Sequence, residues 1–372
     1  MGRQLVFRGA DGYEGLKAHL VSLGIRKLML VCGRSLAHTP AGHFFDTLTA
    51  DTGTEVLRFS GFTPNPDYDD IVKGVDMFRE SGCDAVCGAG GGSAMDTAKC
   101  IRLFAGMSGV RPYTEQLPVH DDILLIAIPT TAGTGSEATH FAVIYRNGEK
   151  LSVADEGALP GAVLLDAGNL AGLPEVHRNA SMLDALCHAI ESLWSVNSTA
   201  ESMELSRAAI RAVTENMEGY TAGACRTEML EAAYTAGQAI NITTTTAAHA
   251  MSYKLTKLYG IPHGHAAALC LPEVYRFLSE NADRCTDRRG VSHLRSILGE
   301  IPPLLGCDSF RAALSLLSGL PGRLGLTAPE QAADEDIAVL AACVNTRRLN
   351  NSPVIPDREE IKEMYIRILR RN

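Results

Sequence analysis

Four side chains in the second half of the chain have the types and spacing of a metal site. Asp184 and His188 stand four residues apart, so in a helix they would lie on one face, one turn apart. His249 and His263 follow downstream, the second in a Pro-His-Gly turn. One carboxylate and three imidazoles suit zinc or ferrous iron better than magnesium or calcium, which prefer oxygen ligands. If the four converge, the chain is a metal enzyme, and if they do not, they are ordinary polar residues.

A glycine-rich segment in the first half is typical of phosphate binding. Residues 88–93 follow an apolar run and precede a helical pattern. Glycines let backbone amides approach a phosphate closely, and a helix N-terminus favours an anion. Ser93 would cap this helix, with Asp96 at capping-box spacing. The spacing matches neither Gly-x-Gly-x-x-Gly nor a P-loop, so it predicts a phosphate or pyrophosphate without naming the ligand. A turn that only packs a strand against a helix is the alternative.

A second polar segment, residues 129–137, follows another apolar run and contains four hydroxyl side chains and two glycines after its proline. Such a loop suits contacts to a ribose or a nicotinamide amide when it stands at the edge where parallel sheets bind ligands. A solvated loop is the alternative.

The elements that must position these residues differ between the two halves. In the first half, short apolar runs alternate with helical patterns, which predicts a parallel sheet wrapped by helices. The expected strands are residues 27–32, 54–59, 85–88, 123–128 and 162–166, and the expected helices include 68–81 and 95–104. After about residue 173, helical patterns take over at 181–192, 200–217, 227–239, 247–258 and 272–281. We therefore predict an α/β Rossmann-like dinucleotide-binding domain over residues 1–172 and an all-α metal-binding domain over residues 173–372.

Composition limits the possible partners. The 372 residues carry a net charge of −9 without a basic tract interleaved with aromatics, so nucleic acid is not expected as a partner. The ten cysteines are scattered, which favours reduced thiols over a disulfide framework. No signal peptide and no membrane span is recognisable. We expect a soluble, cytoplasmic protein that acts on a small molecule.

Several motifs together resemble the iron-dependent (group III, metal-containing) alcohol dehydrogenases. They are residues 59–66, 93–99, 130–137, 182–191 and 261–264. The resemblance implies a dehydroquinate synthase-like two-domain fold, a homodimer, bound NADP or NAD, and one divalent metal, Fe2+ or Zn2+. The implied ligands are Asp184, His188, His249 and His263. The metal would act as a Lewis acid on an aldehyde oxygen while the nicotinamide exchanges a hydride.

The resemblance also implies cofactor contacts. They fall on Gly33, Arg34, Ser35, Asn65, Gly90, Gly91, Gly92, Ser93, Asp96, Thr130, Thr131, Thr134 and Lys150. NAD-preferring relatives tend to carry an aspartate after the first strand, whereas this chain has Arg34 and Ser35 there. We therefore expect NADP(H) to be accepted, although Arg34 is equally consistent with a surface turn. Lys150 resembles a family lysine that reaches the active site, with a turn lysine as the alternative.

The residues that would handle a proton and the substrate depart from the common pattern. Many relatives carry a histidine four residues after the third ligand, where this chain has Tyr253. Tyr253, His265, or the cofactor ribose with solvent would take that role.

Residues 138–143 and 247–256 resemble the phosphonoacetaldehyde reductase subgroup, which forms 2-hydroxyethylphosphonate. Lys254, Arg347 and Arg348 are then candidate partners for the phosphonate, or else solvated cations.

Three other functions remain open at this point. The first keeps the dehydrogenase and changes its substrate to lactaldehyde, another short-chain aldehyde or a diol. The second is a cyclase like dehydroquinate synthase, which releases no reduced cofactor. The third is a non-catalytic binding protein.

Overall fold

The computed structural model describes residues 4–107, 123–147, 149–329, 332–344 and 346–370. The chain divides into two compact units. The first unit comprises Met1–Thr131 and Gly135–Leu173, and the second comprises Ala132–Thr134 and Pro174–Asn372. A short piece of the polar loop that follows the fourth expected strand thus belongs to the second unit.

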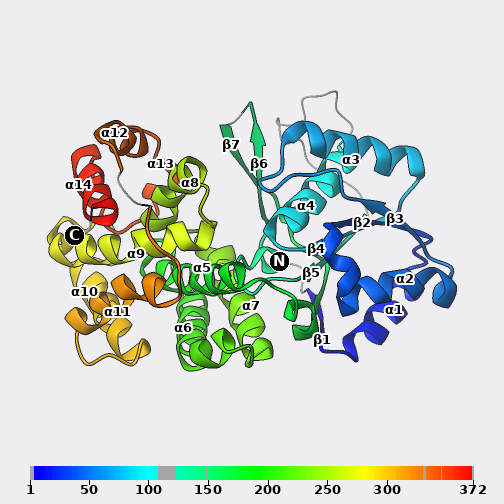
Figure 1. Ribbon diagram of the computed structural model, residues 1–372, viewed down its shortest axis with the longest axis horizontal. Coiled ribbons are helices and arrows are strands. Elements are labelled where there is room, and N and C mark those ends of the chain that lie inside the picture. Colours follow the sequence, from blue (N-terminus) through cyan, green and yellow to red (C-terminus); the bar gives the residue numbers. More distant parts are fainter. Residues whose placement is uncertain (1–3, 108–122, 148, 330–331, 345, 371–372) are drawn as a thin grey trace. The chain divides into compact units, whose positions relative to one another are not determined.

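The first unit is built on a six-stranded parallel sheet (Figure 1). Its strands are β1 (Leu5–Arg8), β2 (Lys27–Cys32), β3 (Glu55–Phe59), β4 (Ala85–Gly90), β5 (Leu124–Pro129) and β8 (Ala162–Leu165). They are ordered β1-β8-β5-β4-β2-β3. Each central strand reads as a continuous apolar run because helices cover both faces of the sheet. The prediction of a Rossmann-like sheet is confirmed.

Alternating side chains of the strands divide the core of this unit in two. Leu28 and Leu30 face one core, together with residues of α1 (Gly12–Ser22) and α2 (Pro40–Thr52). Met29 and Val31 face the other, together with residues of α3 (Tyr68–Ser81) and α4 (Gly92–Gly106). Two helices on each face are therefore required to bury this sheet.

The first unit also contains an antiparallel pair, β6 (Phe141–Arg146) with β7 (Glu149–Ala154), which the sequence analysis did not predict. Short 3-10 turns complete it: η1 (Arg34–His38), η2 (Ser136–Ala138), η3 (Glu156–Ala158) and η4 (Ala167–Leu170).

The second unit is helical throughout the part that the structure describes, which confirms the all-α prediction. Its helices are α5 (Glu175–Trp194), α6 (Ala200–Thr221), α7 (Arg226–Thr243), α8 (Ala247–Tyr259), α9 (His263–Glu280), α10 (Val291–Leu304), α11 (Phe310–Arg323), α12 (Asp334–Ala342), α13 (Thr346–Leu349) and α14 (Arg358–Leu369), with the 3-10 turn η5 (Ala282–Arg284). The central helix α5 is buried almost all round from Asn179 to Trp194.

The start of α9 differs from the sequence prediction in a way that matters for the candidate ligands. Helix α9 begins at His263, directly after Pro262, and not near Pro272, which lies inside it. A proline is well placed just before a helix because its fixed φ and missing N–H fit there. The interior Pro272 is tolerated although it costs one backbone hydrogen bond. His263 therefore belongs to a first helical turn and not to a loop.

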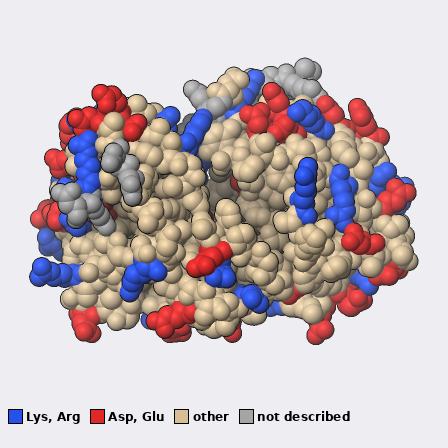
Figure 2. All heavy atoms as spheres, in the orientation of Figure 1, with Lys and Arg blue, Asp and Glu red and all other residues tan. Residues whose placement is uncertain are grey.

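Among the described helices, none combines the length and hydropathy that a membrane span needs. All ten cysteines are free thiols. On the face drawn in Figure 2, basic and acidic side chains lie interspersed.

Candidate functional site

Helix α5 presents three chemically active side chains on one face of the second unit. Asp184, His188 and Glu191 are spaced four and three residues apart, which places them in line along a helix. All three are buried, and their exposed fractions are 3%, 6% and 0%. Buried carboxylates persist only with partners, so this face must meet positive or hydrogen-donating groups.

Two further histidines lie in the first turns of the next helices. His249 is the third residue of α8, and His263 is the first residue of α9. A side chain on Gly264 would lie 2.1 Å from the carbonyl oxygen of Ala180 and 2.6 Å from Cβ of Asp184. Glycine is therefore required at this position, because only its bare backbone lets the start of α9 approach α5 closely enough.

These helices bring Asp184, His249 and His263 together. One ligand atom from each lies within 4.8 Å of the others, a spacing that a single metal ion can bridge. Nε2 of His249 lies 3.4 Å from Oδ1 of Asp184, and Nε2 of His188 lies 3.9 Å from the same oxygen. The His188 ring stacks on the His249 ring, with centroids 4.5 Å apart. Three of the four predicted ligands thus converge, and the fourth lies beside them.

Oxygen atoms engage the far nitrogen of each imidazole. Nδ1 of His188 lies 3.3 Å from the carbonyl oxygen of Gly133, and Nδ1 of His263 lies 3.5 Å from Oγ of Ser252. The Ser252 hydroxyl donates to the His249 carbonyl oxygen, so its lone pairs are left to accept from His263. Nδ1 of His249 contacts a Glu191 carboxylate oxygen. These oxygen contacts favour a proton on Nδ1 of each ring, which would leave Nε2 as the nitrogen that binds a metal.

The charges of the cluster favour a cation. Burial would raise the pKa of Asp184, but the imidazoles of His188 and His249 hold it below its ordinary value. Burial would also lower the pKa of His249, but Glu191 and Asp184 raise it to about 10. Burial lowers the pKa of His188 to about 4, which leaves this ring neutral. Positive charge is therefore favoured between the two carboxylates, and the donor set fits one divalent ion of borderline softness.

The remaining candidates of the second unit lie at different distances from this cluster. The Tyr253 ring stacks on His263, with centroids 5.4 Å apart and an interplanar angle of 12°. His265 is also buried, but two residues along a helix correspond to about 200°, so it lies on the other side of α9 from His263. Burial lowers the pKa of His265, and its Nε2 has no hydrogen-bond partner among the described residues.

The predicted substrate cations lie on neighbouring helices. Lys254 is half-buried on α8, one residue past Tyr253, and α13 packs against α8. Arg348, on α13, is half-buried as well. The side chain of Arg347 lies outside the described residues.

The first unit gathers its candidates at one edge of the sheet. The register aligns Cys32 with Ala89 and Gly90 with Pro129, so the segments that follow β2, β4 and β5 emerge side by side. In the sheet, β2 lies between β3 and β4, so the chain continues from β2 to its neighbour on one side, β3, and then crosses to its neighbour on the other side, β4. The point between β2 and β4 is where such sheets bind dinucleotides. Gly33, Arg34 and Ser35 follow β2 there and are exposed.

The glycine turn is open in the way that phosphate binding requires. Gly91 precedes α4 without a side-chain cap, so the predicted capping box of Ser93 and Asp96 is wrong. The helix begins two residues earlier than expected, and both side chains therefore lie inside its first turns. The Ser93 hydroxyl instead accepts the Asn65 N–H at 3.3 Å. Gly91 has no side chain that could accept hydrogen bonds from the first N–H groups of α4. These groups are therefore available to an anion.

The polar loop after β5 contributes the next contacts. The Thr130 N–H donates to the Gly90 carbonyl oxygen at 2.9 Å. Oγ1 of Thr131 is buried and has no hydrogen-bond partner among the described residues. It lies beside the glycine turn, 3.7 Å from where a Cβ on Gly91 would stand. A buried hydroxyl without a partner is costly, so a bound polar group fits this place. Thr134 belongs to the second unit, and half-buried Lys150 lies in β7.

Three charged side chains near the glycine turn, half-buried Asp96 and buried Lys99 and Glu137, were not recognised as a group from the sequence. Asp96 accepts from the Ser136 hydroxyl at 2.8 Å and the Val143 N–H at 2.9 Å, so it ties α4 to the loop and not to a cofactor. Lys99 donates to Oγ1 of Thr139 at 3.1 Å and to a backbone carbonyl, and burial lowers its pKa to about 8.

Glu137 is the third of these charges. Its side chain is 1% exposed, and neither carboxylate oxygen has a hydrogen-bond partner among the described residues. Burial raises its pKa to about 7, against weaker opposing effects of its own backbone N–H and of Lys99. The only sequence signal for this cluster is Lys99, a lysine inside a helical stretch that must cover the sheet, because Glu137 stands in a polar loop.

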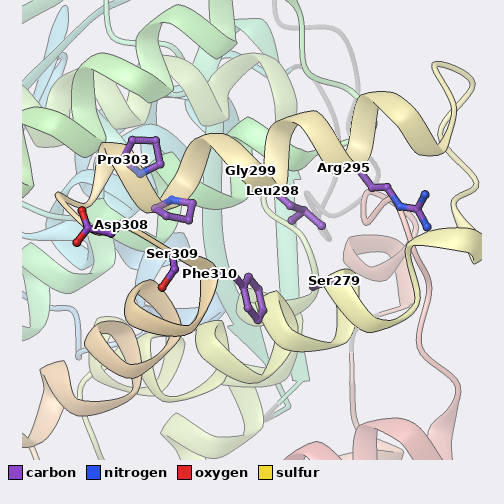
Figure 3. A pocket seen from close by; sticks show the side chains of 9 residues that line it. Ser279, Arg295, Leu298, Gly299, Pro303, Asp308, Ser309 and Phe310 are labelled. Atoms are coloured by element: carbon purple, nitrogen blue, oxygen red, sulfur yellow. The ribbon is translucent and has the colours of Figure 1, made fainter.

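A separate surface hollow in the second unit has a volume of about 410 Å³ (Figure 3). It is lined by residues of α9, α10 and α11, among them Ser279, Arg295 and Phe310. Arg295 already pairs with Asp283 at 2.9 Å, and the hollow contains none of the candidate ligands. It is therefore a poor candidate for a site that binds an anionic substrate.

Known proteins resemble this chain over its whole length. Residues 4–167 match the iron-containing alcohol dehydrogenase domain, and residues 179–369 match the C-terminal domain of the Fe-containing alcohol dehydrogenase family. Phosphonoacetaldehyde reductase of Streptomyces viridochromogenes is 33% identical over 89% of this chain and 87% of its own length. 1,3-Propanediol dehydrogenase of Citrobacter freundii is 32% identical over 82% and 80%. A solved iron-containing alcohol dehydrogenase of Thermotoga maritima is 25% identical, with a TM-score of 0.87 over 100% of this chain and 99% of that one.

Proposed function

Because the chain belongs to the iron-containing alcohol dehydrogenase family, it is an oxidoreductase of alcohols or aldehydes, and we propose that it reduces phosphonoacetaldehyde to 2-hydroxyethylphosphonate. The observation that supports metal-dependent reduction is the convergence of Asp184, His249 and His263. The phosphonate substrate is supported by the 33% identity to a reductase of that name. The reaction consumes one aldehyde, one reduced nicotinamide and one proton, and it yields one alcohol and one oxidised nicotinamide.

The proposed metal ligands are Asp184, His188, His249 and His263, with Fe2+ as the native ion and Zn2+ as a second fit. When bound, the ion would supply Lewis-acid polarisation of the aldehyde oxygen. The chain's own contribution is to orient three imidazoles through the Nδ1 contacts to Gly133, Glu191 and Ser252, so that Nε2 of each ring would bind the ion. Asp184, His188 and His249 are buried, which excludes competing water from their donor atoms, and His263 is half-buried.

The proposed cofactor is NADP or NAD, bound at the edge of the sheet where β2, β4 and β5 end, and it would supply the hydride. The amides of Gly90–Gly92 and Ser93 receive the pyrophosphate, with Asn65 beside them. Thr130, Thr131, Thr134 and Lys150 are proposed contacts to the ribose and the nicotinamide. Gly33, Arg34 and Ser35 present an exposed guanidinium and hydroxyl and no carboxylate, so they accept a 2′-phosphate. Asp96 is not retained as a contact, because its carboxylate is engaged inside the unit.

We assign to the Tyr253 hydroxyl the donation of the proton that the aldehyde oxygen takes up when it becomes the alcohol. Its ring stacks on His263, which places the residue beside the ligand cluster. His265 is set aside because it lies on the other side of α9.

We assign binding of the phosphonate group to basic side chains on two adjacent helices of the second unit. Lys254 follows Tyr253 on α8, and Arg348 lies on α13, which packs against α8. Arg347 is proposed with them as its sequence neighbour. A phosphonate dianion requires such charge-assisted contacts.

An aldehyde panel on iron-reconstituted enzyme, run with NADPH and with NADH, tests the substrate. Phosphonoacetaldehyde should exceed propanal in kcat/KM by on the order of 100-fold, since about two charge-assisted contacts are lost with propanal. Lys254→Ala should lower kcat/KM only for the phosphonate, and Lys257→Ala, an exposed position three residues on, serves as its matched control.

Equal efficiency on propanal would contradict the phosphonate assignment. Preferential oxidation of 1,3-propanediol would favour the diol reading, since a 1,3-propanediol dehydrogenase is nearly as similar to this chain. A strong preference for NADH would contradict the role of Arg34 and Ser35.

A further inference from the structure

We propose that Glu191 is a positioning residue of the metal centre, which fixes the His249 imidazole in its metal-binding orientation. This inference rests on the proposed metal site, but not on the identity of the substrate. Glu191 lies on the same face of α5 as Asp184 and His188, and it is fully buried. It does not belong to the group of three ligand atoms that lie within 4.8 Å of one another.

The two carboxylate oxygens of Glu191 have different partners. Oε2 contacts Nδ1 of His249. Oε1 accepts the N–H groups of Thr246 and Ala248, each at 3.0 Å, and that of His249 at 3.4 Å. These N–H groups belong to the start of α8, where Thr246 provides no side-chain cap and the first turn has no acidic residue. One carboxylate from α5 therefore caps α8 and holds the histidine in its first turn.

The position of Glu191 is itself fixed by its neighbours. The Thr246 hydroxyl donates to Oε1 at 2.5 Å and accepts from Nε1 of Trp194 at 2.9 Å. Trp194 is buried and lies one turn after Glu191 on α5. Both ends of the Glu191–Thr246–Trp194 chain are thus set by α5, so the carboxylate cannot swing away from His249.

This arrangement dictates which His249 nitrogen faces the metal. A carboxylate accepts hydrogen bonds and donates none, so Nδ1 must carry the proton. Nε2 lies 3.4 Å from Oδ1 of Asp184, toward the ligand cluster, and is therefore the nitrogen that a metal ion would bind in exchange for a proton. A neutral amide in place of the carboxylate would offer an NH2 group to Nδ1. That would move the ring proton to Nε2, where it opposes metal binding.

The test compares Glu191→Gln with the wild-type enzyme. The glutamine oxygen still accepts the α8 N–H groups, so the melting temperature of metal-stripped protein should change little. Affinity for Fe2+ or Co2+ should fall about 10- to 100-fold, the size expected when the partner of a metal-binding histidine is lost. The visible absorption of the Co2+-loaded variant should weaken or shift. Glu191→Asp, which keeps the carboxylate but shortens it, should restore part of the affinity.

Glu273→Gln is the matched control. Glu273 is an equally buried carboxylate of the second unit, on α9, and it pairs with Arg367 at 2.9 Å. Its loss should lower the melting temperature and leave metal affinity within about twofold of wild type. Unchanged metal affinity and an unchanged Co2+ spectrum in Glu191→Gln would overturn the positioning role. A wild-type enzyme that binds no stoichiometric metal would instead overturn the proposed function, so the two failures are distinguishable.

Discussion

Replacing Glu137 with glutamine should change how the stability of the first unit depends on pH. Burial raises the pKa of this carboxyl from 4.5 to about 7. The folded unit therefore holds a proton that the unfolded chain releases near pH 4.5. Between pH 4.5 and about pH 7, folding is therefore accompanied by uptake of this proton. The contribution of Glu137 to the free energy of unfolding is fully present below pH 4.5. It is lost as the pH rises through about 7.

The magnitude follows from the size of the shift. Between about pH 5 and about pH 8, the wild-type unit should lose about 2–3 kcal/mol that the glutamine variant keeps, because glutamine has the shape of the protonated acid and no charge to bury. For a unit of this size, that difference corresponds to roughly 5–10 °C in melting temperature. The melting temperature of the variant minus that of the wild type should therefore be larger by this amount at about pH 8 than at about pH 5.

Differential scanning calorimetry of both proteins across this pH range is the assay. Lys99 and Asp96, the other two charged residues of the cluster, are present in both proteins, so their own titration largely cancels in the difference. Glu156→Gln, an exposed glutamate on η3 of the same unit, controls for the loss of one negative charge. A melting-temperature difference between wild type and Glu137→Gln that stays constant with pH would contradict a raised pKa for Glu137. Glu137 would then be ionised and satisfied throughout.

Three further predictions concern the two sites. Asp184→Asn keeps the side-chain volume and removes the ligand charge, so purified variant should retain about a tenth or less of the wild-type metal on elemental analysis after dialysis; full retention would exclude Asp184 as a ligand. Tyr253→Phe keeps the ring that stacks on His263 and removes the hydroxyl, so steady-state kinetics should show kcat reduced about 100-fold, while Tyr253→His should restore activity; wild-type turnover by Tyr253→Phe would leave the proton to the ribose and solvent. A Cβ on Gly91 would make only ordinary contacts at 3.4 Å, so Gly91→Ala should raise KM for the nicotinamide about 10-fold at an unchanged melting temperature. An unchanged KM in Gly91→Ala would argue against a close approach of the cofactor to this glycine. Gly88→Ala is the contrasting variant: its new Cβ would lie 2.9 Å from the backbone of Met95, so its melting temperature should fall.

Much of the fold is predictable because parallel strands buried on both faces appear as uninterrupted apolar runs. The run at residues 27–32 coincides with β2, and the run at 85–88 falls inside β4. The pair β6 and β7 escapes this rule, since its buried side chains in β6 alternate with half-buried ones and form no continuous run. The edge strand β1 has only four residues, and both of its ends are exposed.

The candidate metal site is predictable only as far as one helix extends. Asp184 and His188 are paired by their spacing alone, because four residues make one helical turn. Nothing in the local sequence joins them to His249 or His263, whose approach depends on the bare backbone of Gly264 packing against α5. Glu191 continues the same spacing by three residues, and that signal was available. Its role depends on where α8 begins, which only the three-dimensional arrangement reveals.

The charge of the second unit's site follows from the places where its histidines stand. His249 and His263 both lie in the first turn of a helix, where the backbone carries partial positive charge and disfavours a cation. Helix α5 opposes this effect with two buried carboxylates, Asp184 and Glu191. A divalent ion that displaces the proton of His249 would balance these two carboxylates beside three neutral imidazoles, whereas a monovalent or trivalent ion would leave a net charge buried. If the proposed site is right, Glu191 would contribute to the preference for a divalent ion together with the proposed ligand Asp184.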